Sequence, residues 1–140
     1  MSRILGVDLG SRRIGLALSD PSGTLASPYG VLQRSRDHAT DHRAILAAAR
    51  EGEAERIVVG LPRSLSGRAG PAAQAALVEI EELRAAAGDA ITIEAHDERL
   101  TTVIAERSLV EAGMRRDARR KVVDKAAAAV MLQSYLEAHR

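Results

Sequence analysis

The pattern of apolar residues changes after the first 33 positions, and this change limits the folds that the chain can adopt. Before it, three strand-like segments follow one another with tight turns between them, as in an antiparallel meander. They cover residues 3–9, 13–19 and 24–33. The first is apolar on both sides, which is typical of a central strand. Pro28 and Gly30 interrupt the third, which places it nearer an edge of the sheet.

From residue 40 onward, helical and strand-like segments alternate. Apolar residues at helical spacing predict helices, and short apolar runs predict strands. In chain order we expect a helix over residues 40–51, a strand over 56–60, a loop over 61–70, a helix over 71–87, a strand over 90–96, and helices over about 102–112 and 118–138. Three hairpin strands followed by this alternation predict an α/β fold, in which helices cover the faces of a mixed sheet.

Composition excludes several classes of protein. The 140 residues suffice for one domain, and its core must be aliphatic because Tyr29 and Tyr135 are the only residues among Phe, Trp and Tyr. The absence of cysteine excludes a disulfide framework, a thiolate zinc site and a cysteine nucleophile. No apolar run approaches the ~20 residues that span a bilayer, and the N-terminus lacks a signal-peptide pattern. We therefore expect a cytoplasmic protein with no membrane partner. Its net charge of +1 does not by itself predict a polyanionic partner.

Asp8 is the first candidate functional residue because it lies inside an apolar strand. An isolated carboxylate there is costly unless it is paired, hydrogen-bonded or bound to a metal ion. The alternative is that Asp8 caps the turn at Gly10 through backbone N–H groups. Most other acids need no such explanation, and Glu79, Glu81 and Glu82 are interpreted as solvated groups on a helix surface.

Asp124 is also out of place, because it is the only acid between Ala118 and Leu136. At 3.6 residues per turn it lies on an apolar stripe. The other members of this stripe are Ala127, Ala128, Met131 and Tyr135. The alternatives are an acid favoured by the helix dipole in an early turn or one paired with Lys121 or Lys125.

Asp97 and Glu98 follow the last predicted strand, where strand ends converge and a metal site can form. Strict alternation puts Asp97 in phase with Ile93 and Glu98 in phase with Glu94, and this phase alone does not choose between them. Solvation and capping of the next helix are the alternative. His96 beside them could assist proton transfer, although a structural histidine is the commoner case.

Three misplaced acids from distant segments point to one metal site. Mg²⁺ or Mn²⁺ binds a few carboxylate oxygens and retains waters and substrate phosphate oxygens. Two such ions about 3.5–4 Å apart can activate a water for phosphodiester cleavage. The basic stretch over residues 115–121 would then contact the phosphate backbone without reading sequence. Its alternative is a solvated charged loop.

Four blocks of the sequence resemble the YqgF/RuvX proteins, in the same order and over nearly the whole chain. They are Gly6-Val7-Asp8-Leu9-Gly10-Ser11-Arg12-Arg13-Ile14-Gly15, Val58-Val59-Gly60-Leu61-Pro62, Asp97-Glu98-Arg99-Leu100-Thr101-Thr102 and Val123-Asp124-Lys125-Ala126-Ala127-Ala128. The resemblance implies one RNase H-like nuclease domain over residues 1–140. Its mixed sheet would have five strands, three antiparallel and then two parallel, with helices on both faces.

The resemblance also implies site residues. It assigns Asp8, Glu98 and Asp124 as the metal-binding catalytic acids, which favours Glu98 over Asp97. The residues that it places against substrate are Ser11, Arg12, Arg99, Thr101, Arg120 and Lys121. One block departs from the family, because Arg63-Ser64-Leu65-Ser66 stands where the family often has Asn and then Asp-Gly.

The favoured function is therefore a metal-dependent nuclease that processes the 5′ end of pre-16S rRNA in ribosome biogenesis. Holliday junction cleavage is the close alternative, and it would require a dimer with paired sites, whereas rRNA trimming allows a monomer or a homodimer. Asp8-Leu9-Gly10-Ser11 also resembles the first phosphate loop of actin-like ATPases, but one domain lacks their second half. A non-catalytic nucleic-acid-binding adaptor is the remaining alternative.

Overall fold

A computed structural model describes residues 3–61, 71–97 and 116–139 of the chain, with the backbone alone for residues 72, 97 and 116–125. Its elements are β1 (Arg3–Leu9), β2 (Arg13–Ser19), β3 (Ala26–Gln33), α1 (His38–Glu51), β4 (Ala54–Leu61), α2 (Pro71–Ala87), β5 (Thr92–Asp97) and α4 (Arg116–Ala138). The helix expected over residues 102–112 lies outside the described residues. All the other predicted helices and strands are confirmed, and no end differs from its predicted position by more than two residues.

The five strands form one sheet in the order β3-β2-β1-β4-β5. The β1–β2 and β2–β3 pairs are antiparallel, and the β1–β4 and β4–β5 pairs are parallel. This is the mixed α/β sheet that the sequence predicts. The strand that is apolar on both sides lies at its centre, and the strand with Pro28 and Gly30 lies at its edge.

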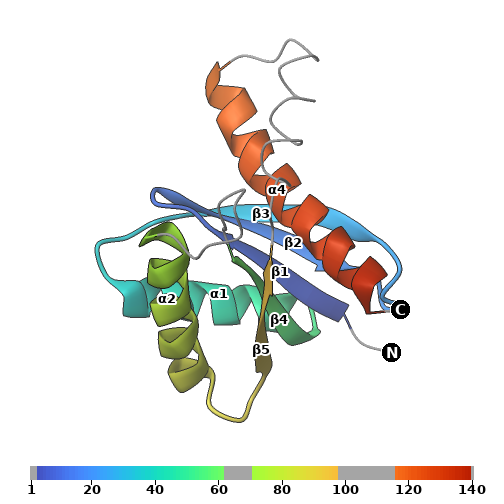
Figure 1. Cartoon of the computed structure of the whole chain (residues 1–140), viewed down its shortest axis with the longest axis horizontal. Helices are drawn as coiled ribbons and strands as arrows, with labels where there is room; N and C mark the ends of the chain where they lie inside the picture. Colours follow the sequence, from blue (N-terminus) through green and yellow to red (C-terminus); the bar gives the residue numbers. More distant parts are fainter. Residues whose placement is uncertain (1–2, 62–70, 98–115, 140) are drawn as a thin grey trace.

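Helices cover both faces of the sheet, α1 and α2 on one side and α4 on the other (Figure 1). Because successive side chains along each strand point to opposite faces of the sheet, the core has two parts, one on each face. Leu5 and Val7 of β1 pack toward α1 and α2, where Ile45 and Leu83 meet them. A second cluster, which includes Val58 of β4, packs against α4. Within the described residues, no helix has the length and apolar character needed to cross a membrane.

Side-chain caps explain why two elements begin where they do. The carboxylate of Asp20 accepts hydrogen bonds from the backbone N–H groups of Thr24 and Leu25, at 2.8 and 3.0 Å. These two residues therefore belong to a turn, and β3 begins at Ala26 rather than at the expected residue 24. Asp37 is the N-cap of α1, so the helix begins two residues earlier than apolar spacing alone predicts.

Gly10 is needed in the β1–β2 turn because the backbone approaches it closely. A glycine in a tight turn often supplies a positive φ, but Gly10 is not among the residues with positive φ. Instead, its N–H donates to the carbonyl of Arg13 at 3.0 Å. A Cβ on Gly10 would lie 2.4 Å from that carbonyl oxygen, closer than any side chain can approach. Close backbone approach is the constraint.

Candidate active site

Asp8 lies between two glycines in the middle of the sheet. Its partners in the strand register are Gly15 on β2 and Gly60 on β4. Gly60 in turn pairs with His96 on β5. Because cross-strand partners project from the same face, neither neighbour on either side of Asp8 places a side chain beside the carboxylate. Asp8 is half-buried there.

The face that carries Asp8 is the face that α4 covers. Two residues before Asp8, Gly6 lies under α4, and a Cβ on it would be 2.9 Å from Leu132 Cβ and 3.4 Å from the carbonyl oxygen of Ala128. The stripe expected on this helix is indeed buried against the sheet. Its described members are Ala127, Ala128, Met131 and Tyr135, each at most 2% exposed.

Contacts of Tyr135 fix the direction in which α4 crosses the sheet. Its hydroxyl donates to Glu94 Oε2 at 2.6 Å and accepts from Arg56 Nη1 at 2.9 Å. Arg56 pairs with Ile4 near the start of β1, whereas Ala128 lies over Gly6. Going backward along α4 therefore goes forward along β1, toward Asp8.

The hydrogen bonds of Tyr135 with Arg56 and Glu94 join α4 to β4 and β5, and both are charge-assisted. Arg56 Nη1 also lies 3.2 Å from Glu94 Oε1, so three side chains from three elements form one group. Burial raises the pKa of Tyr135, and donation to the Glu94 carboxylate raises this pKa further. The phenol therefore remains protonated at neutral pH and anchors the helix.

His96 lies on the same sheet face as Asp8 and contacts α4. Its Nε2 is 3.2 Å from Ser134 Oγ, and its ring meets Tyr135 edge-on with 5.6 Å between ring centroids. These contacts are those of a histidine that packs the helix onto the sheet, which is the structural interpretation given above.

The other predicted site residues are described to different extents. Ser11 and Arg12 are exposed in the β1–β2 turn, directly after the strand that carries Asp8. Asp124 lies within α4, as do Arg120 and Lys121, and their backbone is described without side chains. Glu98, Arg99, Thr101 and the segment Arg63-Ser64-Leu65-Ser66 lie outside the described residues.

One acid that we interpreted as solvated is buried, and that interpretation was wrong. The side chain of Glu79 on α2 is 8% exposed. Both its oxygens accept hydrogen bonds from Arg34, at 2.7 Å each. Burial raises the pKa of Glu79, but the hydrogen bonds from Arg34 and His42 outweigh it, so the pKa lies below its usual value. The signal in the sequence is position 79 itself, one turn from the apolar Ala76 and Leu83.

Hydrogen bonds from Arg34 connect the buried Glu79 to the turn that follows Asp8. Its Nε donates to the carbonyl of Gly10 at 2.9 Å, and its backbone N–H donates to the carbonyl of Arg12 at 2.9 Å. Its Nη1 also lies 3.4 Å from Asp41, a buried acid of α1. The guanidinium thus connects the β1–β2 turn to both helices on the opposite face of the sheet.

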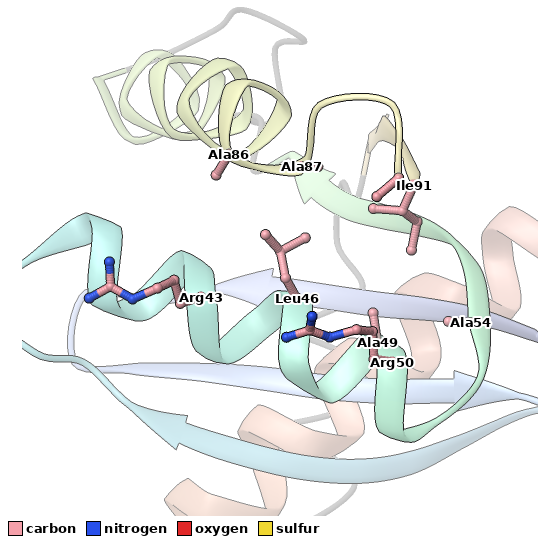
Figure 2. A pocket seen from close by; sticks show the side chains of 9 residues that line it. Arg43, Leu46, Ala49, Arg50, Ala54, Ala86, Ala87 and Ile91 are labelled. Atoms are coloured by element: carbon pink, nitrogen blue, oxygen red, sulfur yellow. The ribbon is translucent and has the colours of Figure 1, made fainter.

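A pocket of about 270 Å³ opens between α1 and α2. In Figure 2, Leu46 points from α1 toward Ala86 of α2, with Arg43 and Arg50 on either side of it along α1. The pocket is lined by Arg43, Leu46, Ala49, Arg50, Ala54, Ala86, Ala87, Ala90 and Ile91. The pocket lies on the sheet face opposite Asp8, and none of its described lining residues is a carboxylate or a nucleophile.

Solved structures with a similar fold include resolvases. The chain superposes on T. thermophilus RuvC, solved in complex with a Holliday junction substrate, with a TM-score of 0.58 and 17% identity over 99% of this chain and 96% of that one. The yeast mitochondrial Holliday junction resolvase Ydc2 gives a TM-score of 0.57 and 14% identity over 96% of this chain and 78% of that one. At these identities the likeness establishes the RuvC-type, RNase H-like fold.

Curated relatives are much closer in sequence. A protein of Mycobacterium sp. (strain KMS) is 43% identical over 138 residues, which are 99% of this chain and 81% of the relative. A protein of Mycobacterium ulcerans (strain Agy99) is 45% identical over 138 residues, which are 99% of this chain and 80% of the relative. Both are named as proposed pre-16S rRNA nucleases. A model of the family described as "RuvX: Holliday junction resolvase" matches residues 2–138. On this match and these identities, the chain belongs to the RuvX family.

Proposed function

We propose that the protein is a divalent-metal-dependent nuclease that hydrolyses phosphodiester bonds in structured nucleic acid. In this proposal one nuclease domain spans residues 1–140, and Asp8, Glu98 and Asp124 bind the ions. The observation that carries it is the position of Asp8, between Gly15 and Gly60 on the sheet face that α4 covers. A half-buried carboxylate whose two direct cross-strand partners are glycines suits a bound cation.

The helical repeat of α4 supports Asp124 as the second acid. Gly6 faces the part of α4 between Ala128 and Leu132, which follow Asp124 by four and eight residues, or about 6 and 12 Å along a helix. Asp8 follows Gly6 by two residues, which is roughly 6–7 Å along a strand. Since α4 runs backward relative to β1, the two displacements have the same direction. We therefore expect Asp8 and Asp124 to lie near each other, between β1 and α4.

The phase of β5 supports Glu98 as the third acid. Glu94 and His96 both contact α4, whereas Ile93 packs into the core on the other face. Strict alternation past the end of β5 assigns Glu98 to the side of Glu94 and His96, and Asp97 to the side of Ile93. The alternation therefore favours Glu98 over Asp97 as the partner of Asp8.

The residues fit Mg²⁺ or Mn²⁺, which prefer carboxylate oxygens. Such ions, when bound, would activate a water molecule and stabilise the leaving oxygen. The chain's own part is to hold the carboxylates on a rigid sheet and helix, and Tyr135 keeps that helix in place. Ser11, Arg12, Arg99, Thr101, Arg120 and Lys121 are the groups proposed to hold the phosphate backbone of the substrate.

The proposed substrate is pre-16S rRNA, since the curated relatives are named as nucleases of this RNA. We propose cleavage at its 5′ end, in the cytoplasm. Junction DNA is the alternative. A resolvase cuts two symmetric strands and needs two sites related by a twofold axis, whereas trimming one RNA end needs a single site. A monomer in solution would therefore favour the rRNA substrate.

The test is cleavage of two substrates by the purified full chain. A pre-16S rRNA 5′ fragment and a four-way DNA junction are incubated with Mg²⁺ or Mn²⁺, with wild type, Asp8→Asn and the matched control Asp89→Asn. Asp89 is an exposed acid in the turn before β5. We expect metal-dependent cleavage of the rRNA by wild type and Asp89→Asn, and its loss in folded Asp8→Asn. Cleavage of neither substrate, or undiminished cleavage by Asp8→Asn, contradicts the proposal.

A further inference from the structure

Two histidines and two glutamates face one another between α1 and α2. His38 and His42 are four residues apart on α1, and Glu79 and Glu82 are three residues apart on α2, so each pair lies on one helix face. One possible ligand atom from each of His38, His42 and Glu79 lies within 4.8 Å of the other two. This group is distinct from the acids of the candidate active site, because α1 and α2 cover the opposite face of the sheet.

Hydrogen bonds already aim these side chains at one another. His42 Nε2 lies 2.8 Å from Glu79 Oε2, and His38 Nδ1 lies 3.1 Å from Glu82 Oε1. His42 is 3% exposed and Glu79 8%, whereas His38 is 55% exposed. The group is therefore a buried pair with an open side, through which an ion can enter.

The charges in this group favour a cation. Among the described residues, the buried carboxylates of Glu79 and Asp41 share one guanidinium partner, Arg34. With neutral histidines, two negative charges and one positive charge leave this buried part with a net charge of −1, and the carboxylate of Glu82 lies at its open side, 45% exposed. A buried excess of negative charge is costly in a medium of low dielectric constant, and a bound cation would offset it.

We propose that His38, His42 and Glu79 bind one Zn²⁺ ion, with Glu82 or a water molecule in the fourth position. Two imidazoles and a carboxylate form a donor set that suits zinc, in contrast to the all-oxygen set expected around Asp8. Tetrahedral bonds of about 2.0–2.1 Å place ligand atoms roughly 3.3 Å apart. The exposed side chain of His38 is the one that can move inward to reach this spacing.

Arg34 and His42 have defined roles in this site. Arg34 donates to both oxygens of Glu79, from Nη2 to Oε1 and from Nη1 to Oε2. The ion would take the side of Oε2 that now faces His42 Nε2, while both hydrogen bonds from Arg34 remain, as partners of metal-bound carboxylates usually do. A neutral His42 must present the lone pair of Nε2, so its proton must be on Nδ1 when the ion binds. Zinc affinity should accordingly fall in acid.

The consequence would be a clamp between α1 and α2. Through Arg34, the same clamp would reach the carbonyls of Gly10 and Arg12 in the turn after Asp8. An ion that binds the folded state alone raises the midpoint of thermal unfolding. The clamp is structural, and the inference stands whether or not the chain is a nuclease.

The experiment is zinc binding by the untagged full chain after removal of metals with a chelator. Competition with a chromogenic chelator gives the affinity, and the visible absorption of bound Co²⁺ reports tetrahedral geometry. We expect one ion per chain in wild type. His38→Gln, which leaves the buried Arg34–Glu79–His42 contacts in place, should weaken binding about tenfold or more and reduce the rise in thermal midpoint at a given Zn²⁺ concentration.

Two controls separate this site from others. Asp8→Asn removes the acid central to the candidate active site, and His139→Gln removes a histidine that stacks on Tyr135 of α4. Both should bind Zn²⁺ as wild type does. The proposal is overturned if wild type binds no Zn²⁺, if His38→Gln binds as tightly as wild type, or if affinity is lost in Asp8→Asn instead. None of these results depends on nuclease activity.

Discussion

Gly6 of β1 lies directly against Leu132 of α4, and a Cβ on Gly6 would be 2.9 Å from Leu132 Cβ. Side-chain Cβ atoms do not approach one another so closely, so the absence of a side chain at position 6 sets the distance between helix and strand. Asp8 follows two residues later on the same face of β1. The contact therefore governs how near the helix that carries Asp124 comes to Asp8.

Replacing Gly6 with alanine should force α4 away from β1. Overpacking of this kind costs about 1–3 kcal/mol of the free energy of unfolding, and we expect the cleavage rate to fall with it. Urea unfolding measures the change in the free energy of unfolding. Gly30→Ala is the matched control, because a Cβ on Gly30 meets nothing within 4 Å, and it should stay within about 0.5 kcal/mol of wild type. Equal stabilities for the two variants would contradict the close contact.

Replacing Arg34 with methionine should be strongly destabilising. The change removes the two hydrogen bonds from Arg34 to the buried carboxylate of Glu79 and leaves only the contact with His42. The side chains of Arg34 and Glu79 are 14% and 8% exposed. Loss of one partner from a buried ion pair costs about 3–5 kcal/mol. Chemical denaturation checks this, with exposed Arg36→Met as the control.

The double variant tests the physical reason for that loss. In Arg34→Met/Glu79→Gln no unpaired carboxylate remains at position 79, so the combined cost should be smaller than the sum of the two single costs. Additive costs would mean that Arg34 stabilises the fold through its packing or through its hydrogen bonds to the β1–β2 turn.

Asp20 should contribute stability at neutral pH that disappears in acid. The hydrogen bond from the Ser22 hydroxyl, with those from the backbone N–H groups of Leu25 and Thr24, lowers the pKa of Asp20 from 3.8 to about 2. A carboxyl whose folded pKa is lowered stabilises the fold above its unfolded pKa, and this contribution is lost as the pH falls toward the folded pKa. The window is therefore from about pH 4 down to about pH 2.

Urea midpoints of wild type and Asp20→Asn, compared across this window, provide the measurement. Wild type should be the more stable at pH 7, and the difference should shrink as the pH falls toward 2. Ser22→Ala should show the same trend with a smaller amplitude, since two backbone donors remain. A difference that does not change with pH would mean that asparagine replaces the hydrogen bonds fully and that the charge contributes nothing.

Local patterns were enough to predict the fold. Apolar periodicity identified the strands and helices, and the hairpin order with its later alternation identified the mixed sheet. Element ends were less accurate where a single side chain decides them, as Asp20 does for β3 and Asp37 for α1. These carboxylates act on backbone N–H groups through geometry that hydrophobic spacing does not contain.

The candidate site could be predicted where a single segment of the sequence contains a residue that does not fit its surroundings. Asp8 stands out because a carboxylate inside an apolar strand is costly whatever surrounds it. Its two glycine neighbours in the sheet depend on strand register, which the sequence alone did not give. Glu79 was misinterpreted for a related reason, since its partner Arg34 is 45 residues away along the chain. Pairings over such separations are set by the tertiary structure.

The central claim is that Asp8 and Asp124 bind divalent cations together. Mn²⁺ affinity, measured by the electron paramagnetic resonance signal of free Mn²⁺, tests it in folded Asp8→Asn and Asp124→Asn variants beside Asp89→Asn. The account predicts that each of the first two variants loses most of the Mn²⁺ affinity while Asp89→Asn keeps it. Wild-type affinity in either Asp8→Asn or Asp124→Asn would contradict a shared site.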